Sequence, residues 1–253
     1  MNISAVLIVK DEEKNIVDCL DSLSFVDEIV VVDDNSTDRT IELAERLAKE
    51  KAIKIFKREL DNDFSAQRSF GVEKTTNDWV LFVDADERVT KELATEINES
   101  LTPNTEYGGF LIPRIDFMWG KQLKHGETGN IKLLRLFDKQ KGSLKGKVHE
   151  IWETKNKVGV LSSPIKHYPH PTVGDFLQEI NFYSDLRSRE LFEKGEKSNL
   201  FSIIIYTKAK FLQNYFLKRG FLDGTPGFIH AILMSLHSFL VRGKLWLLWQ
   251  KYQ

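Results

Sequence analysis

Glycine is missing from the first 70 residues of this 253-residue chain, and cysteine occurs only once, at Cys19. A single cysteine cannot form an intramolecular disulfide. The first strand-to-helix turn cannot be the Gly-x-Gly-x-x-Gly turn of a dinucleotide fold, because the glycines of that turn are absent. No Gly-x-x-x-x-Gly-Lys-Ser/Thr sequence occurs either, so a P-loop kinase or ATPase is not supported.

Net charge is also nearly absent. The formal charge is -1, which gives no reason to expect a nucleic-acid partner. Hydrophobic residues make up 42% and charged residues 29%, as in a globular chain. No basic segment followed by an apolar one opens the sequence, so no secretory signal is visible and a cytoplasmic location is expected.

Short apolar runs alternate with helical spacing over the first half of the chain. This alternation predicts a parallel sheet with right-handed crossovers. In the first expected helix Cys19 falls on the apolar side, which predicts a packed thiol. The expected strands are 3–9, 28–32, 53–56 and 79–83, with helices between them from 16, from 41 and over 64–72.

Two carboxylates, Asp84 and Asp86, directly follow the apolar run 79–83. Ligands of open α/β sheets bind at the carboxyl ends of the strands, where this pair is expected. Like charges this close raise each other's pKa unless a cation lies between them, and Mg²⁺ or Mn²⁺ would serve and also accept phosphate oxygens. The alternative is that the pair only caps the next helix.

Residues 3–13, 30–38 and 83–86 resemble, in the same order, three motifs of family-2 glycosyltransferases. Residues 3–13 are similar to the opening strand and Asn-Glu turn, with Asp11 where many members have Asn. Residues 30–38 resemble the Val-Asp-Asp-Gly-Ser-Thr-Asp signature with Asn35 in place of Gly, and residues 83–86 match Asp-x-Asp. The resemblance implies an α/β fold of GT-A type, with a mostly parallel sheet and flanking helices, that binds a nucleotide-sugar and a divalent metal.

The resemblance also implies roles for single residues. The backbone near Val9, together with Glu12, would border the nucleoside, and Asp34 would accept a hydrogen bond from the base. Arg68 lies in a segment that resembles the family's Ala-Arg-Asn helix and would hold the nucleotide, unless it is only a solvated helix arginine.

The resemblance further implies that the Asp-x-Asp motif contacts the ribose and the metal. Asp84 would face the ribose and the metal, and Asp86 would ligate the metal that bridges the diphosphate.

An inverting transfer needs a carboxylate that takes the proton of the acceptor hydroxyl. Val148-His149-Glu150 resembles the Val-His-Glu of lipopolysaccharide-core glucosyltransferases. Glu150 is therefore the expected base and His149 a metal or phosphate contact, with Asp116 as the reserve base. The alternative for His149 and Glu150 is an exposed pair at a strand end.

Further polar residues leave two interpretations open. Lys132 and Arg135 either meet diphosphate or an anionic acceptor, or form a solvated strand face. His167 either belongs to a proline-stiffened turn or reaches the metal from the sheet. The glycine-rich segment 119–130, with His125, has the length of a functional lid.

Residues 1–172 are expected to form the catalytic domain, and 173–253 a C-terminal helical region. After Glu196 the only acidic residue is Asp223, whereas eight Lys and Arg residues follow. Such a basic, aromatic segment is typical of a membrane interface, or else it packs on the sheet or on a second subunit.

Together these resemblances imply a metal-dependent, inverting glycosyltransferase. It would move a hexose, glucose from UDP-glucose, to a glycan or lipid-linked glycan acceptor such as lipopolysaccharide core. Peripheral membrane contact and a homo-oligomer are the expected associations, with no nucleic acid. The alternatives are a phosphatase of the haloacid dehalogenase kind, disfavoured by Arg88 two residues after Asp86, and a non-catalytic glycan- or lipid-binding scaffold.

Overall fold

The computed structural model describes residues 1–61, 63–103, 105–145 and 151–251, which form two compact units. Unit 1 comprises Met1–Arg114 and Lys132–His167, and unit 2 comprises Ile115–Ile131 and Tyr168–Gln253. Residues 115–131 thus group with the C-terminal helices, although the expected boundary lies at 172. Which part of the chain carries which function stays a prediction.

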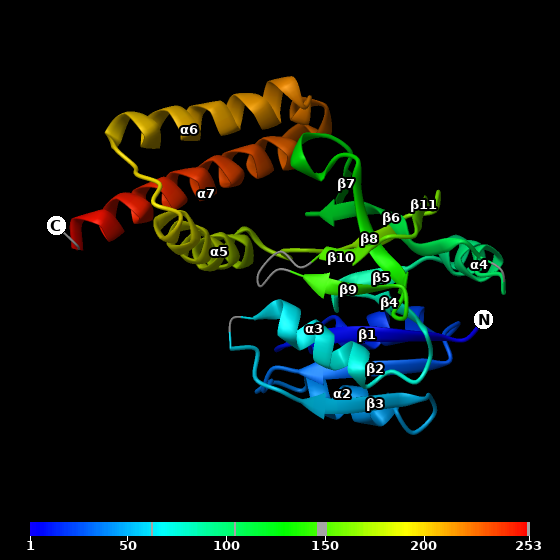
Figure 1. Ribbon diagram of the computed structural model, residues 1–253. Coiled ribbons are helices and arrows are strands. Elements are labelled where there is room, and N and C mark those ends of the chain that lie inside the picture. Colours follow the sequence, from blue (N-terminus) through cyan, green and yellow to red (C-terminus); the bar gives the residue numbers. More distant parts are fainter. Residues whose placement is uncertain (62, 104, 146–150, 252–253) are drawn as a thin grey trace. The chain divides into compact units, whose positions relative to one another are not determined.

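Unit 1 is a sheet with helices on both faces (Figure 1). The helices are α1 (Ile16–Ser22), α2 (Thr40–Leu47), α3 (Phe64–Glu73) and α4 (Lys91–Ser100). The strands are β1 (Ile3–Val9), β2 (Glu28–Asp33), β3 (Ile53–Lys57), β4 (Trp79–Phe82), β5 (Glu87–Val89), β6 (Tyr107–Met118, which ends in unit 2), β8 (Ile131–Asp138), β11 (Lys157–Val160) and β12 (Ile165–His167). β9 (Gly142–Lys145) and β10 (Ile151–Thr154) pair separately.

The strand order is β3-β2-β1-β4-β8-β6-β12-β5. β1 pairs in parallel with β2 and β4, and β2 with β3, as the sequence predicts; β8 joins β4 antiparallel, which makes the sheet mixed. The chain steps outward from β1 to β3 and then returns to the other side of β1 for β4. This reversal creates a switch point at the carboxyl ends of β1 and β4, the usual ligand site of such sheets.

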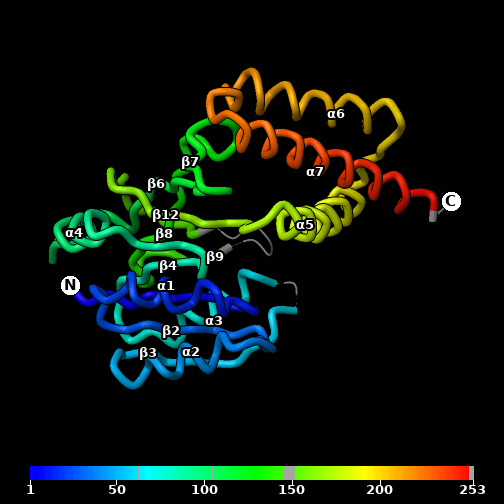
Figure 2. Tube along the Cα trace, turned by 180° about the vertical axis from the view of Figure 1, so that it is seen from behind, coloured from blue at the N-terminus to red at the C-terminus, as the bar shows by residue number. Residues whose placement is uncertain are grey.

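Side chains of β1 alternate between two cores, as the two-residue period of a strand requires. Ile3 and Leu7 face α1, α2 and α4, and Val6 faces α3. Figure 1 shows α3 on the near face of the sheet, and Figure 2 shows α1 and α2 on the opposite face. Helices on both faces explain why β1 and β4 carry apolar side chains on both sides of the sheet.

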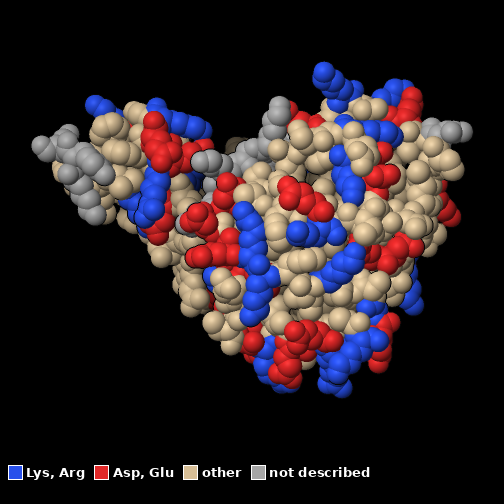
Figure 3. All heavy atoms as spheres, turned by 60° about the horizontal axis from the view of Figure 1, so that its bottom comes forward, with Lys and Arg blue, Asp and Glu red and all other residues tan. Residues whose placement is uncertain are grey.

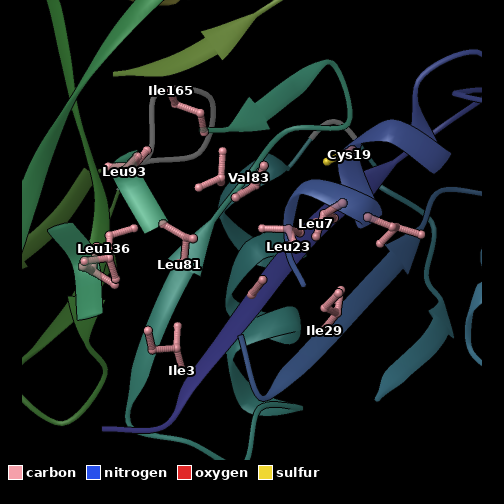
Figure 4. Close-up of a cluster of buried hydrophobic side chains, with 14 of the residues drawn as sticks. Ile3, Leu7, Cys19, Leu23, Ile29, Leu81, Val83, Leu93, Leu136 and Ile165 are labelled. Atoms are coloured by element: carbon pink, nitrogen blue, oxygen red, sulfur yellow. The ribbon is translucent and has the colours of Figure 1, made fainter. Parts of the chain in front are cut away.

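Cys19 lies in the first of these cores, next to Leu7 and Val83 (Figure 4). Its side chain is fully buried, and Sγ donates to the carbonyl oxygen of Asp84 at 3.4 Å. Burial raises the pKa of the thiol well above its ordinary value. The predicted role as a packed thiol is confirmed.

Unit 2 is mainly helical. Its helices are α5 (Val173–Glu193), α6 (Leu200–Leu212), the π turn η2 (Gln213–Leu217), the 3-10 turns η1 (Gly126–Thr128) and η3 (Gly220–Asp223), and α7 (Gly224–Lys251). The short strand β7 (Lys121–Leu123) pairs with the end of β6. α6 and α7 lie side by side in Figures 1 and 2 and form a hairpin through η2 and η3.

Charged side chains of both signs are interspersed on the face shown in Figure 3. That face presents no large field of one sign, in keeping with the nearly balanced charge of the sequence.

Candidate active site

Three turns that carry carboxylates meet at the switch point. The turn after β1 holds Glu12, the turn after β2 holds Asp34, and the turn after β4 holds Asp84 and Asp86. The backbone N–H of Asp34 donates to the carbonyl of Val9 at 2.9 Å, which fixes the first two turns together. Parallel strands end at one edge of the sheet, so the fold gathers residues that are distant in sequence.

The turns after β1 and β2 both need a left-handed residue. Asp11 has φ 53° and Asn35 has φ 54°. Oδ1 of Asp11 accepts the N–H of Thr37 at 2.7 Å, and Ser36 Oγ accepts the N–H of Asp11 at 3.0 Å. Asn and Asp tolerate this conformation better than other non-glycine residues. The two departures from the family pattern therefore keep the geometry of the turns.

Asp34 is buried and holds two partners. Its Oδ1 accepts the N–H of Leu60 at 2.8 Å, and its Oδ2 lies 2.9 Å from Lys10 Nζ. The Lys10 side chain is 59% exposed, so it can leave without unfolding the turn. The Oδ2 atom is thus the oxygen that can be offered to a ligand.

Asp84 is bound by two arginines. Arg68 Nη2 of α3 lies 3.0 Å from Oδ1, and Arg135 Nη2 of β8 contacts Oδ2. Partial burial disfavours the charge of Asp84, but the charges of Arg135 and Arg68 outweigh it and lower the pKa of this carboxyl. The Arg68 guanidinium also lies 5.3 Å from the centre of the Phe82 ring. Arg68 is therefore not a solvated helix arginine.

Arg135 also contacts a carboxylate that sequence reasoning missed. Its Nη2 lies 3.0 Å from Oε1 of Glu87, and both side chains are buried. Burial raises the pKa of Glu87 although Arg135 opposes this shift. Of the two interpretations that the sequence left open for Arg135, the solvated strand face is wrong. Lys132, on the same strand, is exposed.

Asp86 lies beside His167, the last residue of β12. The distance from His167 Nε2 to Asp86 Oδ2 is 3.2 Å, and the side chains are 12% and 26% exposed. The structure therefore brings His167 to the Asp-x-Asp motif, and its contact with a metal stays a prediction.

These contacts change the electrostatic argument for a metal. Asp84 has Arg68 and Arg135 as cationic partners, and Asp86 has His167, which is cationic only when protonated. Among the described residues, no three His, Cys, Asp or Glu side chains gather into a ready metal site. The spacing of the two carboxylates alone therefore does not require a metal ion.

The raised pKa of Glu12 reflects burial and unbalanced negative charge at the carboxyl edge of the sheet. Burial, and after it the nearby charges of Asp86, Asp38 and Asp84, raise its pKa to about 7, although Asn15 donates to it at 2.8 Å. A cation or a ligand with donor groups would relieve this potential.

The expected base cannot be placed. Glu150 and His149 lie outside the described residues, so their roles stay predictions. The reserve base, Asp116, is buried near the end of β6 and belongs to unit 2.

The sequence pattern of the family described as glycosyl transferase family 2 matches residues 4–155. The chain belongs to this family. It is 28% identical over 247 residues to the lipopolysaccharide core biosynthesis glycosyltransferase LpsC of Rhizobium meliloti, covering 96% of this chain and 92% of that protein. It is 27% identical over 256 residues to an uncharacterized glycosyltransferase of Rickettsia typhi, covering 96% and 86%.

A solved structure supports the same fold. S. aureus TarS 1-349 in complex with UDP matches with a TM-score of 0.51 and 16% identity, covering 100% of this chain and 92% of that one. This family-2 glycosyltransferase therefore has the predicted GT-A type fold with a C-terminal helical region. Family membership also removes the phosphatase and the non-catalytic scaffold as alternatives.

Proposed function

We propose that this glycosyltransferase transfers glucose from UDP-glucose to a hydroxyl of a cell-surface glycan of the lipopolysaccharide-core kind, in the cytoplasm at the inner face of the membrane. The observation that carries the proposal is that Glu12, Asp34 and the Asp84 turn meet at the switch point of an open α/β sheet. The name of LpsC supports the acceptor class, and UDP bound to TarS supports the nucleotide.

The nucleoside fits the edge formed by Val9, Glu12 and Asp34. The base N–H would take Asp34 Oδ2 in place of Lys10, while the N–H of Leu60 keeps the other oxygen in position. The freed Lys10 ammonium would remain close to the ligand. Arg68 is held next to Asp84, which would put its charge near the ribose and the diphosphate.

The donor atoms of Asp86 and His167 fit Mg²⁺ or Mn²⁺. Such ions commonly take one or two protein ligands and complete their shell with phosphate oxygens and water. Asp84, whose two oxygens already contact arginines, suits the ribose and positions the turn better than it suits the metal. When bound, the ion would stabilise the charge that develops on the departing diphosphate.

Glu150 is the proposed base and His149 a proposed contact to phosphate or metal. The carboxylate takes the proton of the acceptor hydroxyl as its oxygen bonds to the anomeric carbon. The bond from that carbon to the diphosphate breaks, UDP leaves, and a single displacement inverts the anomeric centre.

The test is a donor screen that measures UDP release from several nucleotide-sugars, with a membrane extract as acceptor, together with calorimetry of UDP with and without Mn²⁺. Asp86→Ala should lower turnover by about a thousandfold and weaken UDP binding mainly when Mn²⁺ is present. Asp78→Ala is the matched control, because Asp78 is exposed at the opposite end of β4. Full activity of Asp86→Ala in EDTA would exclude the metal mechanism.

The base is tested by Glu150→Gln, which keeps the shape of the side chain but cannot accept a proton at neutral pH. Turnover should fall by about a hundredfold while donor affinity is kept. Near-normal turnover would transfer the role to another residue, with Asp116→Asn as the next variant.

A further inference from the structure

Helix α6 has an unusual surface for a helix of a globular protein. None of its residues is buried, although most of them are apolar or aromatic. Leu200 is 72% exposed and Phe201 73% exposed, with Ile204 and Ile205 above 40%. Apolar exposure on this scale marks an interaction surface.

The exposed apolar surface continues through the turn between α6 and α7. We call residues 211–228 the hairpin tip. The Tyr215 ring packs against Phe221 and Phe228, with ring centres 6.2 and 5.5 Å apart. Around this cluster Leu217 is 80% exposed and Leu222 is 53% exposed. The aromatic cluster is therefore flanked by apolar side chains that are exposed to solvent.

The exposed charges of the hairpin tip are positive. Lys218 and Arg219 are exposed. The acidic residue of the tip, Asp223, is buried, and its carboxylate accepts the N–H groups of Lys124 and His125 at 3.0 and 2.8 Å. His125 Nδ1 lies 2.9 Å from the same carboxylate. The exposed surface thus combines cations with apolar side chains and shows no carboxylate.

The hairpin tip is also held in place. The carbonyl of Lys218 accepts the N–H of Gly126 at 2.9 Å, and Lys121 Nζ donates to the carbonyl of Asp223 at 2.8 Å. Binding through a fixed surface loses less conformational entropy than binding through a flexible one.

We propose that the hairpin tip docks into the interfacial layer of an anionic lipid bilayer. Leu217 and Leu222 would enter the boundary between headgroups and acyl chains, and Lys218 and Arg219 would meet lipid phosphates. This inference rests on the membrane location in the proposed function and adds the surface that meets the lipid, but it depends on neither the donor nor the metal.

Two other arrangements fit less well. A symmetric dimer through the hairpin tip would bring Lys218 and Arg219 against their own copies without an exposed carboxylate in the tip to pair with them. By length and composition alone, Gly220–Gln250 could cross a membrane. Leu233 and Leu245 of that helix, however, are buried in clusters with α5, so one face of α7 is already covered by protein.

The experiment is flotation of the full-length protein with vesicles of phosphatidylcholine, with and without phosphatidylglycerol, at low and at high salt. Wild type should float with the anionic vesicles at low salt and be released by salt. Leu217→Asp should weaken binding at least tenfold, since it replaces an apolar group that enters the lipid by a charge. Lys218→Glu should weaken it by about fivefold or more.

Val160→Asp is the matched control, because Val160 is 52% exposed but lies on β11 of unit 1. This variant should bind vesicles like wild type, and all variants should keep their melting temperature and UDP affinity. The inference is overturned if wild type ignores anionic vesicles at low salt, or if Leu217→Asp and Val160→Asp bind equally. It is also overturned if size-exclusion chromatography shows that Leu217→Asp dissociates a dimer while vesicle binding stays unchanged. If wild type does not bind UDP at all, that result counts against the proposed function and not against this inference.

Discussion

Strand β4 and helix α6 are both predominantly apolar, but they use this character in opposite ways. Every residue of β4 is buried, because helices cover both faces of the sheet, whereas no residue of α6 is buried. The carboxylates that follow β4, Asp84 and Glu87, are paired with arginines inside unit 1. In the hairpin tip Lys218 and Arg219 stay exposed. An apolar sequence therefore predicts a packed core only where neighbouring elements cover it.

The largest effect should come from removing a buried cation of unit 1. Arg135→Met leaves Asp84 and Glu87 without their shared partner, which should cost about 3–5 kcal/mol of unfolding free energy. Lys132→Met, on the exposed part of the same strand, should cost less than about 0.5 kcal/mol. Urea denaturation measures both; equal losses would show that the buried pairing is not what distinguishes unit 1.

One buried leucine of β4 and one exposed leucine of α6 test whether the apolar residues of these two elements differ in their contribution to stability. Leu81→Ala creates a cavity in the core of β4 and should cost about 2–5 kcal/mol. Leu200→Ala, at a position that is 72% exposed, should change stability by less than about 0.5 kcal/mol. A large loss at Leu200 in dilute solution would mean that α6 is covered by another copy of the chain.

The left-handed turn should give a smaller effect. Asn35→Ala places a side chain that tolerates φ 54° poorly, which should cost about 1–2 kcal/mol. Asn35→Gly, the residue of the family signature, should be close to neutral. Thermal unfolding of the two variants makes the comparison, and equal melting temperatures would show that the turn relaxes to another conformation.

The smallest effect is the pH dependence of Glu12. Its pKa of about 7 in the folded protein exceeds the ordinary 4.5, so between these values the folded state binds more protons than the unfolded state. The free energy of unfolding should therefore fall as the pH rises through this window. Glu12→Gln should reduce that fall by on the order of 1 kcal/mol, and Glu13→Gln, at an exposed site, should not. Parallel pH profiles of wild type and Glu12→Gln would contradict the shift.

The order of the elements from β1 to β4 could be predicted from sequence, because buried parallel strands and amphipathic helices differ in period. The Asp-x-Asp turn and Asp34 were also visible, since they follow apolar runs directly. Glu87 and the pairing of Arg135 were not visible, and for His167 the sequence left two interpretations open. These contacts depend on β8 and β12, whose neighbours in the sheet are set by tertiary packing and not by local pattern.

The second unit was less predictable for a related reason. The sequence predicted a helical region over 173–253, where α5, α6 and α7 lie, but it could not show which apolar residues are covered. The grouping of residues 115–131 with these helices depends on contacts such as His125 with Asp223, which are 98 residues apart. No local property of the segment 119–130 predicts that partner.

Chemical modification of the buried thiol of Cys19 can report local opening at the candidate active site. Cys19 is fully buried and its thiol donates to the carbonyl of Asp84. An alkylating reagent can therefore reach it only when α1 and the end of β4 separate. The rate of modification therefore counts spontaneous openings of the turn that carries Asp84. A nucleotide that holds this turn closed would lower the rate of alkylation. Because the chain has one cysteine, the natural sequence already carries the probe.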